Sequence, residues 1–259
     1  MNILRKIIDF KKPLVQELKE TIPIKFLEKS IYFNTPVVSM KEYLNRENAS
    51  GIIAEFKRKS PSKGDINKYA KVDEVTLGYM QAGASALSVL TDEHFFGGKN
   101  SDLTVARKYN FCPILRKDFI FDEYQIFEAK SIGADVILLI AEVLSKEEVK
   151  KLSSIAKTLG LEVLLELHSI DQIEKINKNI DIIGVNNRNL KTFEVSIENS
   201  ISIAKSLLQD IVKISESGIK SADEILTLKE YGYRGFLIGE RFMNAPRPQE
   251  ACKTLVSSI

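Results

Sequence analysis

The chain has 259 residues, 44% hydrophobic and 28% charged, and its 37 basic and 35 acidic residues leave a formal net charge of +2. The two signs are interspersed without a basic or acidic tail, so overall charge predicts binding to neither nucleic acid nor a membrane surface. Two cysteines far apart, two histidines and no apolar run long enough to span a membrane predict a reduced, cytoplasmic protein without a histidine-based metal site.

Residues 1–50 predict helices that precede the repeating part of the chain. Apolar residues recur at helical spacing and give the first helix one apolar face; they are Ile3, Leu4, Ile7, Ile8, Leu14, Val15 and Leu18. Ser39, followed three residues later by Glu42, marks the start of another helix. Such helices can close the amino-terminal end of a barrel or cover its active site, and amphipathicity alone does not separate the two roles.

From residue 52 onward, short apolar runs alternate with helix-length stretches. The runs are eight in number: 52–56, 85–90, 113–117, 135–140, 161–166, 181–186, 211–215 and 235–239. Ser145, Ser221 and, more weakly, Asp122 begin capping boxes, and glycines that can end helices precede the next strand at Gly83, Gly133, Gly160 and Gly232.

This alternation predicts parallel strands joined by right-handed helical crossovers. Eight units favour a closed (β/α)8 TIM barrel over an open doubly wound sheet, and the length suits one domain, with an N-terminal helical extension at 1–50 and the barrel at 51–259. The sequence contains neither G-x-G-x-x-G after the first strand nor a P-loop, so both nucleotide-binding motifs are missing.

Charged and polar residues stand where these strands end. Glu55 and Lys57 share a face of the first strand because side chains alternate. Lys117, Glu166 and Asn186 end later strands. In a barrel the carboxyl ends of the strands meet on one face, which is where active sites lie. A single case would indicate a structural ion pair, but several on one face predict an active site.

The last two strands predict a phosphate site. Ser217 and Gly218 follow the seventh strand and Gly239 follows the eighth, each before a helix start. Bare backbone N–H groups there can bind an anion, and this is the usual phosphate position of such barrels. The alternative is that these glycines serve only tight turns.

Several nearby residues can be assigned more than one role from the sequence. Lys117 can act as a general acid if its pKa is pulled toward neutrality, whereas Asp118 should face away and cap a helix or loop. Phe95, Phe96 and Phe119 are either packing residues or the wall for a flat ring. The run Lys57–Lys59 could be a basic loop that touches nucleic acid, but it is isolated from other basic clusters.

With these residues assembled, the sequence resembles the indole-3-glycerol-phosphate synthase family of tryptophan biosynthesis over nearly its whole length. The matching segments include IIAEFKRKSPSKG at 52–64, PILRKDFI at 113–120, LLELHS at 164–169, IGVNNRNL at 183–190, SESGI at 215–219 and FLIGERFM at 236–243. The resemblance implies a carboxy-lyase that closes an indole ring on 1-(2-carboxyphenylamino)-1-deoxyribulose 5-phosphate and releases carbon dioxide and water. This chemistry needs a proton donor and a base and demands no metal or redox cofactor.

The resemblance also implies roles for single residues. Lys117 matches the general acid of ring closure, Glu166 matches the base or charge-stabilising glutamate, and Glu55 with Lys57 matches a pair that aids dehydration. The catalytic set predicted in this way is Glu55, Lys57, Lys117, Glu166, Asn186 and Ser217. Predicted substrate contacts are Ser60, Pro61, Phe96, Phe119, Arg188, Leu190 and Ile219, and the predicted phosphate site is Ser217, Gly218 and Gly239. The chain departs from some members in having Glu240 in place of serine and Asn189 in place of aspartate.

Two other functions stay open at this stage. Another phosphosugar barrel, such as phosphoribosylanthranilate isomerase, shares the phosphate glycines but needs a different acid–base pair. A catalytically inactive barrel subunit would be expected to lose one or more of the four central charges. We expect a monomer, with a dimer as the alternative, whose partner is a small phosphorylated substrate.

Overall fold

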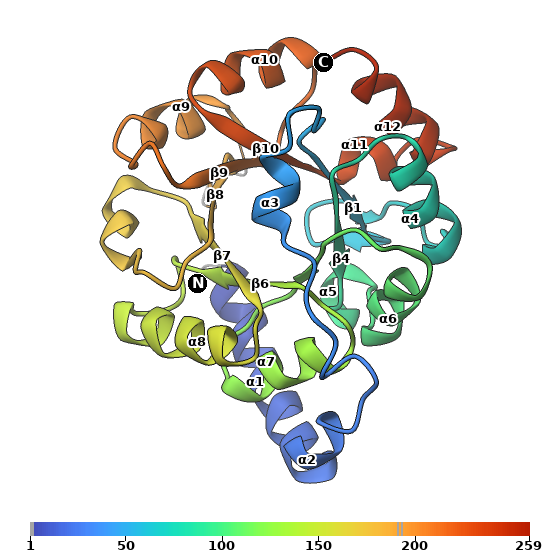
Figure 1. The fold of residues 1–259 in the computed structure, drawn as a ribbon, viewed down its shortest axis with the longest axis vertical. Coiled ribbons are helices and arrows are strands. Elements are labelled where there is room, and N and C mark those ends of the chain that lie inside the picture. Colours follow the sequence, from blue (N-terminus) through green and yellow to red (C-terminus); the bar gives the residue numbers. More distant parts are fainter. Residues whose placement is uncertain (1–2, 191, 193) are drawn as a thin grey trace.

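The computed structural model describes residues 3–190, 192 and 194–259, and its centre is a closed barrel of eight parallel strands (Figure 1). The strands are β1 (Ile52–Phe56), β4 (Ala86–Leu90), β5 (Ile114–Lys117), β6 (Val136–Ile140), β7 (Glu162–Leu167), β8 (Ile182–Asn186), β9 (Val212–Glu216) and β10 (Tyr233–Ile238). Each strand pairs with its neighbour in chain order, and β10 returns to pair with β1. The predicted TIM barrel is confirmed.

Helices surround the barrel and connect its strands (Figure 1). They are α4 (Val72–Gln81), α5 (Glu93–Phe96), α6 (Asn100–Tyr109), α7 (Glu123–Ser131), α8 (Lys146–Thr158), α9 (Glu198–Ala204), α10 (Ala222–Glu230), α11 (Glu240–Met243) and α12 (Pro248–Val256). The β7–β8 connection instead carries a 3-10 helix, η1 (Ile170–Lys175), and β2 (Lys59–Ser60) pairs with β3 (Gly64–Asp65) in a small hairpin after β1.

The local signals in the sequence are satisfied as predicted. Ser145 accepts a hydrogen bond from the Glu148 N–H at 3.2 Å, and the Glu148 carboxylate accepts from the Ser145 N–H at 2.7 Å. Equivalent capping boxes begin α7 and α10. The glycines predicted to end helices all have positive φ; they are Gly83, Gly133, Gly160 and Gly232. Strand boundaries agree to within two residues, and β9 extends one residue beyond the prediction, to Glu216.

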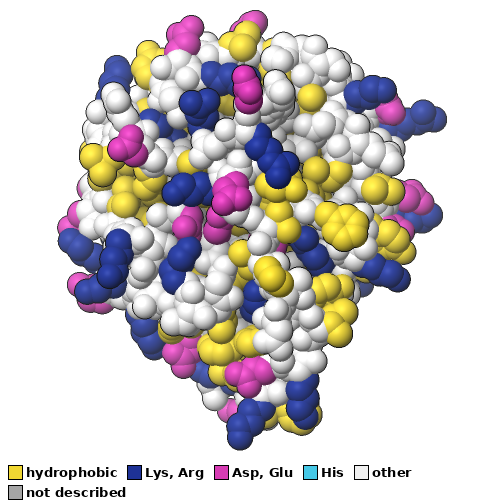
Figure 2. Space-filling view, in the orientation of Figure 1, with side chains coloured by type: hydrophobic (Ala, Val, Ile, Leu, Met, Phe, Trp, Pro, Cys, Tyr) yellow, Lys and Arg dark blue, Asp and Glu magenta, His cyan; other side chains and the backbone are white. Residues whose placement is uncertain are grey.

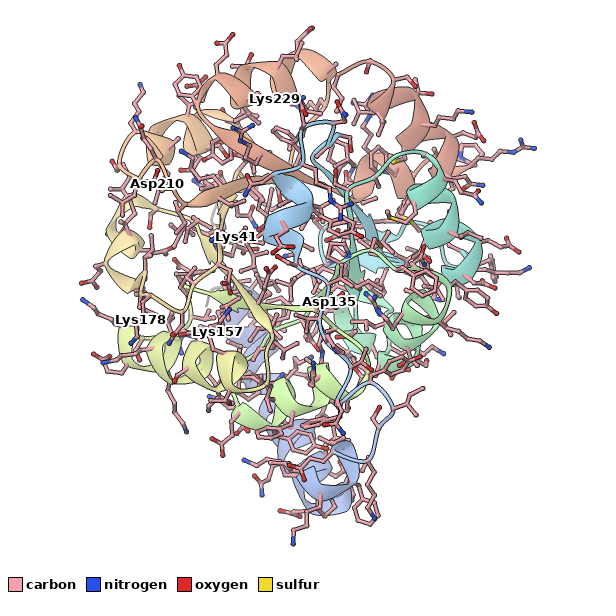
Figure 3. All side chains as sticks on the ribbon, in the orientation of Figure 1. Lys41, Asp135, Lys157, Lys178, Asp210 and Lys229 are labelled. Atoms are coloured by element: carbon pink, nitrogen blue, oxygen red, sulfur yellow. The ribbon has the colours of Figure 1, made fainter. Side chains whose placement is uncertain are left out.

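The helices of the N-terminal extension lie at both ends of the barrel. It contains α1 (Ile3–Thr21), α2 (Ile24–Leu27) and α3 (Met40–Leu44). In Figure 1, α3 lies across the middle of the ring of strands, and Lys41 on α3 and Asp135 before β6 are labelled in Figure 3 on the same face. Met40 and Lys41 donate backbone hydrogen bonds to Glu162, the first residue of β7. α3 therefore closes the amino-terminal end.

The opposite end of the barrel is covered in part by α1, because Ile3, Leu4 and Ile7 line the cavity there. Both roles considered for the extension are thus filled, each by a different helix. One detail of the prediction was wrong: Leu14 is 46% exposed, since the buried stripe of α1 follows Leu4, Ile7, Ile8 and Val15. A buried stripe narrower than the apolar one leaves Leu14 at its edge.

The face drawn in Figure 2 carries acidic and basic side chains interspersed with one another. This distribution follows the near balance of charges in the sequence. Among the described residues, no helix is long and apolar enough to cross a membrane.

Candidate active site

A cavity of about 690 Å³ opens at the carboxyl ends of the strands. Every residue predicted to be catalytic, substrate-binding or phosphate-binding lines it: Glu55, Lys57, Ser60, Pro61, Phe96, Lys117, Phe119, Glu166, Asn186, Arg188, Leu190, Ser217, Gly218, Ile219 and Gly239. These residues come from seven strands' ends and loops and are up to 184 positions apart, from 55 to 239. Barrel closure alone brings them together.

Lys117 lies at the centre of a buried charge cluster. Its Nζ is 3.1 Å from Glu166 Oε2 and 3.5 Å from Glu216 Oε2, and the three side chains are 16%, 3% and 2% exposed. At the end of β1, Lys57 Nζ donates to Glu55 Oε1 at 2.8 Å. Two ammonium groups therefore face three carboxyl groups in a space that water scarcely reaches, which makes their protonation states interdependent.

The pKa values in this cluster are displaced in opposite directions. Burial by itself would lower the pKa of Lys117, but Glu166, Glu216 and Glu55 outweigh burial and raise it well above its usual value. Burial would likewise raise the pKa of Glu166, but Lys117 and then His168 hold it below its usual value. Burial, reinforced by Glu166 and Glu55, raises the pKa of Glu216 despite Lys117.

These displacements correct one expectation from the sequence. From the sequence, acid catalysis by Lys117 was conditional on a pKa pulled toward neutrality, whereas three surrounding carboxyl groups move that pKa the other way. Lys117 is therefore fully protonated near neutral pH. Glu216 retains a proton under the same conditions, so the site holds an ammonium donor, a neutral carboxyl donor and the ionised Glu166 side by side.

Glu216 is not among the site residues predicted from the sequence. The predicted strand stopped at 215, and Ser217 was chosen as the polar residue at its end, but β9 continues and its last residue points into the barrel beside Lys117. Gly184 on the adjacent strand β8 makes room for it, because a Cβ at that position would overlap Glu216 Oε1. The signal was available: a carboxylate ends an otherwise apolar strand, as at Glu55 and Glu166.

His168 is a second residue that sequence reasoning left out of the site. Neither histidine is assigned a role from the sequence, but His168 lines the cavity, and its Nε2 is 3.5 Å from Glu166 Oε1. Its side chain is 7% exposed, and neither ring nitrogen has a hydrogen-bond partner among the described residues. The other histidine, His94, stacks on Phe10 with ring centroids 4.2 Å apart.

The residues predicted to bind phosphate lie in the loops after β9 and β10. Ser217 and Gly218 adopt the left-handed conformation, with φ of 69° and 71°. Asn187 fixes this turn, because its Nδ2 donates to the Ser217 carbonyl at 3.1 Å and to Ser215 Oγ at 2.9 Å. Gly239 lies against the Glu55 carboxylate, where a Cβ would overlap it. Both glycines line the cavity, and a Cβ at Gly218 would likewise overlap a neighbour, Val195.

Glu240 follows Gly239 and carries a negative charge into this end of the cavity. Lys63 Nζ is 2.6 Å from Glu240 Oε1, and Arg188 Nη2 is 3.9 Å from Glu240 Oε2. Burial would raise the pKa of Glu240, but Lys63, Lys57 and Arg188 lower it. The carboxylate is consequently ionised, and it pairs with cations beside the glycines that the sequence assigns to a phosphate site.

Apolar side chains form the remaining wall. The rings of Phe96 and Phe119 have centroids 6.0 Å apart at a 32° angle. Leu190 and Ile219 line the cavity with them, and Ile3, Leu4 and Ile7 of α1 join the same lining. Phe95, the third aromatic considered from the sequence, instead packs against Phe10 with centroids 5.4 Å apart. The described residues include no group of three or more His, Cys, Asp or Glu side chains arranged to hold a metal ion.

A family model for indole-3-glycerol phosphate synthase matches residues 4–255. The chain belongs to this family. It is 49% identical over 258 residues to the indole-3-glycerol phosphate synthase of Bacteroides thetaiotaomicron, covering 100% of this chain and 99% of that protein. It is 41% identical over 263 residues to the enzyme of Carboxydothermus hydrogenoformans, covering 98% and 99%. Indole-3-glycerol phosphate synthases are decarboxylating lyases of tryptophan biosynthesis, so the resemblance inferred from the motifs is confirmed.

Solved structures outside the indole-3-glycerol phosphate synthase family share the barrel. The 3-hexulose-6-phosphate synthase of Salmonella typhimurium superposes with a TM-score of 0.63 at 11% identity, covering 80% of this chain and 97% of that one. A chain of the tryptophan synthase complex of Pyrococcus furiosus superposes with a TM-score of 0.59 at 14% identity, covering 81% and 97%. At these identities the similarity shows the fold alone.

Proposed function

We propose that this chain converts 1-(2-carboxyphenylamino)-1-deoxyribulose 5-phosphate to indole-3-glycerol phosphate, with the residues of the cavity in the roles below. The observation that carries the assignment is the Lys117 ammonium held between Glu166 and Glu216, 3.1 and 3.5 Å from their nearest oxygens. The substrate needs an acid beside a carbonyl oxygen, a flat apolar wall for its ring and an anion site for its phosphate. The cavity offers all three within about 690 Å³.

Ring closure comes first. The ring carbon that bears the carboxylate attacks the ribulose carbonyl carbon, and the carbonyl oxygen takes a proton from Lys117 to become a hydroxyl. Loss of carbon dioxide leaves its bonding electrons in the ring and restores aromaticity. The buried position of Lys117 favours this step, since a cation in a site of low dielectric stabilises a developing alkoxide strongly.

Dehydration follows. The new hydroxyl leaves as water after taking a second proton, for which the neutral Glu216 and the Lys57 ammonium are the nearest remaining donors. A base, assigned to Glu166, takes one proton from the new five-membered ring. Two protons are delivered and one is returned, and the net proton consumed balances the loss of carbon dioxide from a carboxylate. Glu55, paired with Lys57 at 2.8 Å, orients that donor.

Binding is assigned to the two ends of the cavity. Phe96, Phe119, Leu190, Pro61 and Ile219 would hold the anthranilate ring; Ser217, Gly218 and Gly239 would hold the phosphate; and Ser60, Asn186 and Arg188 would contact the carboxylate or the ribulose hydroxyls. Holding both ends of the substrate positions the reacting carbons, which can supply a large part of the rate enhancement.

The test follows indole fluorescence after the substrate is mixed with purified protein without added metal. The chain has no tryptophan, so indole emission must come from product. A rising signal that disappears with Lys117→Met supports the function and its acid. No signal from a protein that circular dichroism shows to be folded would refute the assignment.

We also propose that the chain works as a single domain and a monomer in the cytoplasm, without a cofactor. Light scattering of the purified protein gives the oligomeric state, since one chain has a mass of 29.2 kDa. Activity that survives exhaustive treatment with a chelator supports the cofactor-free reaction, and activity restored only by a metal would overturn it.

A further inference from the structure

Lys11 belongs to the face of α1 that points toward the barrel. Ile3, Ile7 and Lys11 follow one another at intervals of four residues, so they lie on one side of the helix. The two isoleucines line the main cavity. One turn farther along, this apolar stripe is interrupted by an ammonium group whose side chain is only 11% exposed. A lysine so placed needs a buried partner of opposite charge.

The ammonium of Lys11 has two such partners at the ends of adjacent strands. Its Nζ is 2.5 Å from Asp118 Oδ1 and 3.1 Å from Asp92 Oδ2, and these carboxylates are 2% and 3% exposed. Asp118 directly follows Lys117 on β5, and Asp92 lies two residues after β4. The three groups line a second cavity, of about 630 Å³, beside α1. Asp118 also lines the main cavity, and its carboxylate accepts from Lys11, Thr91 and Arg116.

Both carboxylates also hold the loops that carry the apolar wall. Asp118 Oδ1 accepts from the Phe119 N–H at 2.7 Å, and Asp92 Oδ1 accepts from the Phe95 N–H at 2.7 Å and so caps α5. Lys11 is therefore in contact with the residue between Lys117 and Phe119 and with the cap of the helix that ends at Phe96. A single side chain joins α1 to two loops of the proposed site.

An uncharged side chain in place of Lys11 would leave the buried carboxylates around it with too little positive charge. Arg116 Nη2 is 3.2 Å from Asp118 Oδ2 and 2.5 Å from Glu128 Oε2, so two cations serve three buried carboxylates. Burial would raise the pKa of Asp118, but Lys11 and Arg116 lower it to about 2. Without Lys11, Asp118 would keep only the cation that Arg116 already divides with Glu128, and Asp92 would lose the ammonium beside it, so the loops that both carboxylates hold would be free to shift.

We infer that Lys11 is a positioning residue: through Asp118 and Asp92 it fixes α1 and the Lys117–Phe119 segment relative to each other, so that α1 covers the ring-binding wall. The link that Lys11 makes between α1 and the Lys117–Phe119 segment, here called the tether, is inferred from geometry alone. Its effect on catalysis rests on the proposed function. Lys11 touches neither the main cavity nor Lys117 itself, and its effect is transmitted by Asp118.

The experiment compares Lys11→Met with Lys12→Met. Lys12 is the next residue on α1, but among the described residues its ammonium pairs only with Asp9 on the same helix, and its side chain is 57% exposed. Assayed where circular dichroism shows all proteins folded, Lys11→Met is expected to lose about 10- to 100-fold in kcat/KM, as misplacement of a catalytic group by about 1 Å would cause. Lys12→Met should stay within about twofold of wild type.

The double variant Lys11→Met/Asp118→Asn separates positioning from stability. Removing the charge of Asp118 relieves the unpaired carboxylate, so Tm should recover toward wild type while kcat/KM stays low because the tether is still absent. If kcat/KM recovers together with Tm, Lys11 is only a stabilising residue and the inference fails.

Hydrogen exchange gives a readout that does not depend on activity. The amides of α1 should exchange faster in Lys11→Met than in Lys12→Met and wild type. Equal exchange in all three proteins would overturn the tether. If wild type itself turns over no substrate, the proposed function fails, and the exchange result still decides whether Lys11 holds α1.

Discussion

Replacing Lys117 with methionine should make the stability of the barrel depend on pH in a new way. Lys117 Nζ lies 3.1 Å from Glu166 Oε2 and 3.5 Å from Glu216 Oε2. At an effective dielectric constant of about 20, the distance to the ionised Glu166 corresponds to about 5 kcal/mol of attraction, before the cost of desolvation, whereas Glu216 keeps its proton and adds no ion pair. Because that cost offsets much of the attraction, removing the cation is expected to destabilise the fold by about 3–5 kcal/mol at pH values where Glu166 would otherwise ionise.

The sign of the pH effect follows from the pKa of Glu166. In wild type, Lys117 holds that pKa below its unfolded value, so the stabilisation from Glu166 is present above the unfolded pKa and lost as the pH falls through the folded one. In Lys117→Met, burial without a cation raises the pKa of Glu166 above its unfolded value. The folded state then keeps a proton that the unfolded state releases, and stability declines as the pH rises.

The size of this change can be stated. One group that stays protonated only in the folded state contributes about 1.4 kcal/mol per pH unit, which amounts to about 4 kcal/mol between about pH 5 and about pH 8. The loss relative to wild type should therefore be small near the lower pH and reach several kcal/mol near the higher one. Turnover should fall about 10²- to 10⁴-fold at every pH, because the general acid is absent.

Urea unfolding followed by far-ultraviolet circular dichroism at these two pH values measures the effect, and indole fluorescence measures turnover. Lys12→Met, which removes an exposed ammonium with an exposed partner, should show no pH-dependent loss. If Lys117→Met were equally destabilised at both pH values, Glu166 and Lys117 would not form the charged pair described here. Near-wild-type turnover would remove Lys117 from the mechanism.

Three further substitutions probe other parts of the cavity. Glu166→Gln should lower kcat by about 10²-fold or more with little change in KM, and an effect confined to KM would make it a binding residue. Gly218→Ala should chiefly raise KM, because φ is 71° and a Cβ would overlap Val195; Gly160→Ala, with φ of 74° and open space around it, controls for backbone strain. Glu240→Gln should lower KM severalfold by releasing cations to the phosphate, and an increase in KM would contradict the ionised carboxylate assigned here.

The sequence by itself determined the barrel and placed the predicted site residues at one end of it. The eight apolar runs, the capping boxes and the glycines at helix ends are local signals, each confined to about a dozen residues. They can therefore be recognised without knowing what packs against them. Parallel pairing then requires the carboxyl ends to meet, which is why Glu55, Lys117, Glu166 and Gly239 could be assigned to one face before the fold was known. All fifteen predicted site residues line one cavity.

What the sequence did not determine depends on contacts between distant segments. The predicted strand ended one residue before β9 does, and Glu216 was therefore missed. Because successive side chains of a strand point to opposite faces, an error of one position changes which side chain is expected to point inward. The direction of the Lys117 pKa depends on three carboxyl groups from other strands, and burial of a lysine alone would have moved it the opposite way.

Only the tertiary structure divided the N-terminal extension between the two ends of the barrel. The apolar faces of α1 and α3 are equally suited to either end, and their destinations are fixed by long-range partners: Glu162 for α3, and Asp92 and Asp118 for α1. An amphipathic pattern indicates how much of a helix is buried. Which part of the protein the helix packs against is decided by polar and charged partners about a hundred residues away in the sequence.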